Sequence, residues 1–155
     1  MPARPDRVDE SIYGGISVED NTTETTIESM GTAAQITIFD TNETSKDSTP
    51  DHTNGHITIK FKGTYMITCC ATINSITGAG SKFEMTVTKN NGASVIIPHI
   101  DRNVGGGGAE SGVIAMCGMA ALDPADTVEV WIENETNAQN YVVENISLIL
   151  MKVGD

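Results

Sequence analysis

Histidines beside carboxylates are the first candidates for metal or acid–base chemistry in this sequence. His52 and His56 stand four residues apart, with Asp51 next to the first of them. On a helix, that spacing would bring both imidazoles to one face, where they could bind a metal ion. Pro50 and Gly55 border the pair, and both residue types favour a loop. The sequence therefore predicts no metal site at these residues.

His99 and Asp101 form a second such pair, directly after an apolar segment that ends at Pro98. In a symmetric trimer, three copies of this pair could meet on the axis and bind an ion through the imidazole. Surface loop residues that bind nothing are the alternative interpretation, and the one we adopt. We therefore expect neither a metal nor any other cofactor.

Paired carboxylates could serve as a catalytic acid and base, as they do in glycoside hydrolysis. Glu133 with Glu135, and Asp123 with Asp126, are close enough in sequence to form such pairs. This catalysis needs two different environments, one of which raises the pKa of its carboxyl group. The first pair is predicted on a solvated strand face and the second in a turn, so neither meets that need. No Gly-x-Ser-x-Gly nucleophile elbow occurs either, and we predict that the protein is not an enzyme.

Cysteine gives no indication of a disulfide framework or a zinc site. Cys69, Cys70 and Cys117 are the three cysteines, an odd number without a CxxC pair. Cys69 and Cys70 are adjacent in a predicted strand, so their side chains point to opposite faces. We expect three small, buried apolar side chains with free thiols.

The acidic composition excludes two classes of partner. The 155 residues carry a formal net charge of −12, and the pI is near 4.4. A nucleic-acid site needs clustered lysine and arginine, and an anionic lipid surface attracts the same residues. No apolar run reaches the ~18–20 residues that a membrane span requires. We therefore expect neither a nucleic-acid nor a membrane partner.

Alternation of apolar and polar residues predicts strands along most of the chain, because a period of two gives a strand one apolar face. We find no amphipathic helix, and Asn90-Asn91-Gly92 is a strong hairpin signal. Many short strands with turns between them are typical of an all-β sandwich or barrel. The predicted elements are strands near 35–39, 57–61, 65–73, 83–87, 95–97, 111–121, 128–132 and 141–153, with a long loop at 40–55.

Four short motifs follow one another over residues 57–153. They are Gly63-Thr64-Tyr65 after a strand, Lys89-Asn90-Asn91-Gly92 at the end of another, the turn Leu122-Asp123-Pro124-Ala125-Asp126, and the closing apolar strand Ser147-Leu148-Ile149-Leu150-Met151. In order and spacing they resemble the C1q/TNF-like trimeric jelly-roll domains, where the turn has glycine in place of Ala125. The resemblance implies an all-β jelly-roll sandwich over residues 31–155.

The resemblance also implies a homotrimer, and the apolar pattern agrees with it. The second face of the strand at 65–73 and the face carrying Ile149 and Met151 are too apolar for open solvent. Loops at 40–55 and 100–110 that cover these faces within one chain are the alternative. The residues that we predict at the trimer interface are Tyr65, Met66, Cys70, Ile149 and Met151.

Residues 1–30 are predicted to form an extended N-terminal arm, because polar residues dominate them and two early prolines disfavour a helix. A free-standing jelly roll with such an arm resembles the head decoration, or cement, proteins of bacteriophages. We therefore predict a structural virion protein, made in the host cytoplasm, whose trimer binds the major capsid protein and stabilises the capsid surface. The arm residues expected to make this contact are Arg4, Arg7, Val8, Ile12, Tyr13, Ile16 and Val18.

A receptor- or glycan-binding module, such as a fibre tip or a C1q-like recognition head, is the alternative function. It would contact its ligand with the loops at 74–82, 99–110 and 134–140. Trp131 is a possible surface contact, because it shares the polar side of its strand with Glu129 and tryptophan is common in binding hot spots. Burial of Trp131 under a loop or in the subunit interface is the other interpretation.

Overall fold

The regular structure of the chain consists of strands. The computed structural model describes residues 11–26, 29–76, 80–105 and 110–155, and no helix occurs among them. The predicted all-β class is therefore confirmed. The strands are β1 (Tyr13–Val18), β2 (Ala34–Gln35), β3 (Thr41–Asn42), β4 (Ser48–Asp51), β5 (His56–Ile59), β6 (Gly63–Ser75), β7 (Ser81–Lys89), β8 (Ser94–Val104), β9 (Ser111–Leu122), β10 (Thr127–Asn134) and β11 (Tyr141–Gly154).

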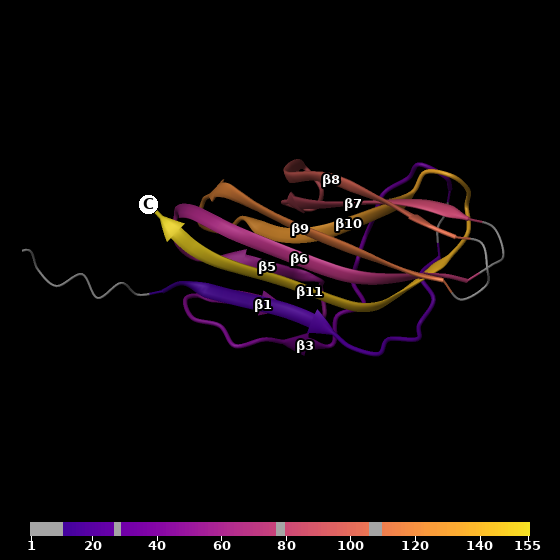
Figure 1. Ribbon diagram of the computed structural model, residues 1–155. Coiled ribbons are helices and arrows are strands. Elements are labelled where there is room, and N and C mark those ends of the chain that lie inside the picture. The colour runs from indigo at the N-terminus through magenta and orange to yellow at the C-terminus, as the bar shows by residue number, and fades with distance from the viewer. Residues whose placement is uncertain (1–10, 27–28, 77–79, 106–109) are drawn as a thin grey trace, which may run out of the picture.

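Two antiparallel sheets pack face to face as a sandwich (Figure 1). The first sheet has five strands in the order β3-β1-β11-β6-β9. The second sheet has six, in the order β4-β5-β10-β7-β8, with β2 paired to β10. Neighbouring strands such as β1 and β11 are far apart in sequence, so the chain crosses repeatedly between the sheets, as in a jelly roll.

The core forms where the apolar faces of the two sheets meet. On β6, every second residue from Tyr65 to Ile73 is buried, and Cys69 is among them. On β11, Ile146, Leu148 and Leu150 are buried in the same alternating way. Burial raises the pKa of Cys69 to about 12, so its thiol stays protonated at neutral pH. The expectation of three buried cysteines is correct only for Cys69, because Cys70 and Cys117 are exposed.

Two segments form more strand than the sequence predicted. The expected loop at 40–55 contains β3 and β4, and β4 pairs with β5 along its whole length. The strand expected to end at Pro98 instead continues to Val104. Proline is tolerated there because β8 is an edge strand, and its register with β7 shifts between Met85 and Val87.

The predicted N-terminal arm is wrong for residues 12–18, which pack into the sandwich. β1 pairs with β11 over its whole length, with Ile16 opposite Leu148. Ile12, Ile16 and Val18 belong to the hydrophobic core, and Tyr13 is half-buried. Hydrophobic burial against the opposite sheet therefore fixes this segment. The other predicted contact residues, Arg4, Arg7 and Val8, lie outside the described residues.

The turn between β9 and β10 has a left-handed residue at Ala125, the position where C1q/TNF-like domains have glycine. Ala125 has a φ of +73°, in the left-handed region that favours glycine. Its N–H donates to the carbonyl of Ile59 at 2.8 Å, and its side chain is exposed. The backbone contacts of the turn thus hold Ala125 in a strained conformation.

Replacing Ala125 by glycine is expected to raise the free energy of unfolding by about 0.5–1 kcal/mol. Glycine removes the strain of the left-handed conformation, which costs a residue with a Cβ ~1–2 kcal/mol in the folded state. Glycine also makes the unfolded chain more flexible, which stabilises the unfolded state by ~0.4–1 kcal/mol and offsets part of this gain. Urea denaturation at fixed protein concentration measures the change. Ala138→Gly, at an exposed loop residue without positive φ, should instead lower stability. If Ala125→Gly lowered the free energy of unfolding, the backbone of Ala125 would not be strained.

Candidate functional site

The outer face of the first sheet carries three rows of aligned side chains. Across β11, β6 and β9, the register places Met151, Met66 and Met119 opposite one another. Because side chains alternate along a strand, the neighbouring rows lie on the same face. They consist of Ile149, Thr68 and Cys117, and of Ser147, Cys70 and Ala115. We call these nine residues the sheet-one face.

The sheet-one face is apolar and open to solvent in the single chain. Met119 is 70% exposed and Ile149 is 46% exposed. β6 and β9 contain no charged residue, in a protein whose net charge is −12. Large exposed apolar patches on otherwise polar proteins mark interaction surfaces. This face is therefore the candidate functional site.

Four of the five residues predicted at the trimer interface lie together on this face: Met66, Cys70, Ile149 and Met151. Tyr65 does not, because it points into the core at 0% exposure, and its hydroxyl donates to the carbonyl of Phe61 at 2.7 Å. Met119 and Cys117 of β9 also lie on this face, although the sequence did not predict them there. Only the pairing of β9 with β6 brings them to this face.

Trp131 lies on the outer face of the second sheet and is half-buried there. A Cβ atom added at Gly92 would stand 3.0 Å from its ring, so the β7–β8 turn covers the indole. Glu129, expected on the exposed side of the same strand, is buried and accepts hydrogen bonds from the N–H of Asn91 at 3.0 and 3.1 Å. The two side chains thus support the turn at residues 90–92.

The paired carboxylates of the β9–β10 turn have a structural role. Asp126 accepts hydrogen bonds from Lys89 Nζ at 2.9 Å, from Asn90 Nδ2 at 2.7 Å and from the Asp123 N–H at 2.9 Å. Burial opposes ionisation of Asp126, but these three donors outweigh it and lower the pKa of its carboxyl group. The carboxylate therefore ties this turn to the end of β7.

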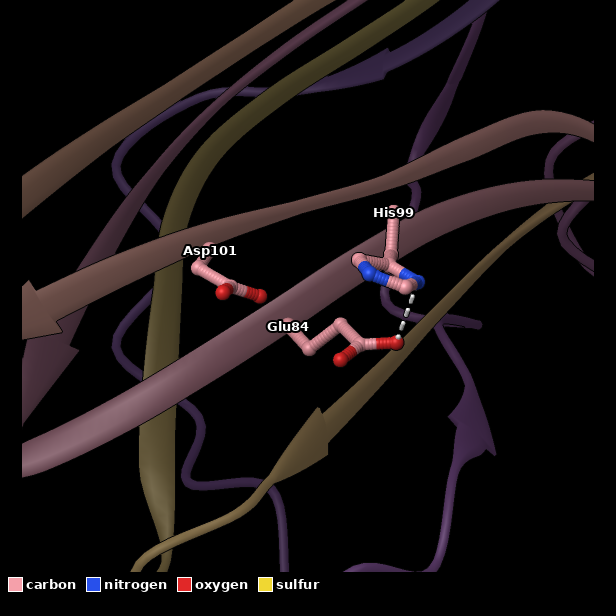
Figure 2. A group of neighbouring side chains, drawn as sticks. All are labelled: Glu84, His99 and Asp101. Atoms are coloured by element: carbon pink, nitrogen blue, oxygen red, sulfur yellow. Dashed lines mark ion pairs between the residues drawn. The ribbon is translucent and has the colours of Figure 1, made fainter.

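His99 and Asp101 lie within β8 and not in the predicted loop. Glu84 of β7 joins them, and its Oε1 is 3.0 Å from His99 Nδ1 (Figure 2). Lys82 Nζ lies 2.8 Å from Asp101 Oδ2 and also pairs with Glu135. The other histidine pair has no comparable geometry, because His56 Nε2 is 3.9 Å from Asp51 and belongs to no group of three potential ligands among the described residues.

The carboxylates around Glu84 have unequal environments. Burial raises the pKa of the Glu84 carboxyl group; a hydrogen bond with Glu135 and the charge of Glu133 raise it further, and His99 opposes this shift. Hydrogen bonds from Lys82 and from Glu84 lower the pKa of Glu135. Of these two carboxyl groups, Glu84 is therefore the one that more readily keeps a proton.

The described residues include no helix that could cross a membrane. No protein-family model matches the sequence, and no curated protein matches it either.

Solved structures share the fold at low sequence identity. The Eiger TNF of S. frugiperda has 12% identity and a TM-score of 0.65, and the match covers 94% of each chain. Murine APRIL has 9% identity and a TM-score of 0.58, over 91% of this chain and 99% of that one. The globular domain of zebrafish complement 1qA has 13% identity and a TM-score of 0.55, over 92% and 96%. The chain therefore has a C1q/TNF-like jelly-roll fold.

Proposed function

We propose that this protein is a homotrimeric structural protein of a virion, which decorates the capsid surface and catalyses no reaction. The observation that carries the trimer is the uncharged, exposed sheet-one face. Burial of a methionine or isoleucine side chain contributes ~1.5–3 kcal/mol, and three copies of the face provide several such side chains. A closed cyclic arrangement is the usual result when a protein has such a patch.

Charge favours this face over the remainder of the surface as the contact between copies. Each chain carries a net charge of −12, so three chains repel one another wherever their acidic surfaces meet. Strands β6 and β9 of the first sheet contribute no charged side chain. Contact through the sheet-one face keeps the acidic residues apart and hydrated.

The capsid contact is assigned to residues 1–10, since the predicted contact residues that follow them, from Ile12 to Val18, pack into the sandwich as part of β1 or directly before it. This segment includes Arg4, Arg7 and Val8, together with the acidic residues Asp6, Asp9 and Glu10. The two arginines can each pair with a carboxylate of the capsid surface. The chain enters the sandwich where Lys152 N–H donates to the carbonyl of Ile12 at 2.8 Å. In a cyclic trimer three such segments leave from equivalent positions, so binding by all three raises avidity without any new kind of contact.

Co-sedimentation with capsids tests this function. Capsids that lack the protein, taken from a virus that encodes it, are mixed with the full chain or with a variant that lacks residues 1–10. The full chain should sediment with capsids, and the deletion should weaken binding by at least ~10²-fold, because it removes all three contact segments and with them the avidity of the trimer. Arg4→Glu with Arg7→Glu should act in the same direction at full length. Equal sedimentation of the deletion variant, or none of the full chain, would contradict the proposed function.

A recognition module is the second candidate, and one feature favours it. The ends of β6, β8 and β10 and the starts of β7, β9 and β11 lie together at one end of the sandwich (Figure 1). Asn137 Nδ2 donates to the carbonyl of Gly80 at 3.3 Å, and Lys82 N–H donates to Thr136 Oγ1 at 3.0 Å. Saturable binding to an immobilised glycan panel that is lost in Asn137→Ala, but kept without residues 1–10, would favour this candidate.

A further inference from the structure

Three potential metal ligands converge on the second sheet, away from the sheet-one face. Figure 2 shows the carboxyl groups of Glu84 and Asp101 and the imidazole of His99 on one side of strands β7 and β8. One ligand atom from each residue lies within 4.8 Å of the others. The set offers one nitrogen and two oxygen donors, unlike a purely acidic cluster.

The backbone imposes this convergence. His99 and Asp101 are two residues apart on β8, so their side chains project from the same face. Glu84 stands directly opposite Asp101 in the register of β7 with β8. Glu133 of β10 stands opposite Glu84 on the other side. Three acidic residues therefore occupy one cross-strand row, and like charges that are directly opposite destabilise a sheet.

The lysine in this region compensates only part of the negative charge. Lys82 bridges Asp101 and Glu135, at one side of the row. Glu84, Glu133 and Glu135 also place a carboxylate oxygen each within 4.8 Å of one another. His99 contacts Glu84 through Nδ1. The row therefore carries uncompensated negative charge, which a bound divalent cation would neutralise.

We propose that Glu84, His99 and Asp101 bind a divalent zinc ion. Zinc takes histidine nitrogen and carboxylate oxygen at ~2.0–2.2 Å in a tetrahedral arrangement, which places ligand atoms roughly 3.4 Å apart. The ligand atoms now lie within 4.8 Å of one another, and rotation of the three side chains brings them to the spacing that zinc requires. A water molecule fills the fourth coordination position. Asp101 has a second oxygen beside the one that accepts from Lys82, so that ion pair need not break.

Calorimetric titration of the full-length protein with zinc chloride tests the site. We expect one zinc ion per chain, and His99→Asn and Glu84→Gln should each weaken binding by at least ~10-fold, because each removes one of three ligands. The matched control is His56→Gln, which removes the histidine beside Asp51 and should leave the affinity unchanged. Circular dichroism confirms that the variants are folded.

Two results would overturn the assignment. Zinc binding that persists unchanged in both His99→Asn and Glu84→Gln would place the ion elsewhere, and no zinc binding by the full-length protein would exclude the site. Calcium chloride provides a further comparison. Calcium that binds more tightly than zinc, with no dependence on His99, would identify the row as an all-oxygen site and contradict the proposal.

Discussion

Met119→Glu is expected to convert the assembled protein into single chains. Light scattering coupled to size exclusion should give about three times 16.4 kDa for the unmodified protein and 16.4 kDa for the variant. Met119 is 70% exposed in the single chain and ends the methionine row on β9. A carboxylate there would be buried without a partner on assembly, which costs several kcal/mol per ion. Its copies in the other subunits would add repulsion.

The same substitution at another exposed methionine is the matched control. Met30 is 58% exposed and lies beside the second sheet, since the neighbouring Gly31 N–H donates to the carbonyl of Asn134 at 2.9 Å. Met30→Glu adds the same charge without touching the sheet-one face, so its mass should remain that of the unmodified protein. A single-chain mass for the unmodified protein, or an unchanged mass for Met119→Glu, would refute this interface.

Ile16→Ala is expected to lower the free energy of unfolding by about 2–5 kcal/mol, the range for isoleucine removed from a core. Ile16 is 0% exposed and stands opposite Leu148 of β11. The alanine leaves a cavity between the two sheets, because neighbouring side chains relax only in part. Urea denaturation at fixed protein concentration measures the loss.

A flexible arm would give a different result. If residues 12–18 were an unpacked segment, Ile16→Ala would leave the stability unchanged. Val95→Ala is the control for removal of a β-branched side chain, because Val95 is 61% exposed on the edge strand β8. Its effect should stay within about 0.5 kcal/mol, as for most surface substitutions. Equal effects of the two substitutions would show that β1 does not belong to the core.

The position of β1 also changes which residues are available to a partner. Three of the apolar residues assigned to capsid binding stabilise the domain itself. The contact proposed above therefore depends on the charged residues before Ile12. The Met119, Ile16 and capsid experiments consequently test three separate properties: assembly, folding and attachment.

Local alternation in the sequence was enough to predict the central strands. Residues 65–73 and 146–150 are buried at every second position, because a period of two places apolar side chains on one face of any strand. The hairpin at Asn90–Gly92 also follows from local chemistry, since asparagine and glycine accept the positive φ that these three residues adopt. The turn at Asp126 has a local contact as well, because its carboxylate accepts from the Asp123 N–H of the same turn.

Only the tertiary structure decided the long-range pairings. Residues 13–18 were predicted to belong to the arm, and only their pairing with β11, from the other end of the chain, makes them a strand of the sandwich. The methionine row needs β6, β9 and β11 in one register, and the ligand set needs Glu84 opposite Asp101 beyond the register shift near Pro98. For β1 and for the methionine row the partner strands are distant in sequence, so local pattern contains no information about which strand lies alongside, whereas burial of a shared core selects it. For β7 and β8 the hairpin signal predicts the pairing but not the register beyond the shift, which decides that Glu84 faces Asp101.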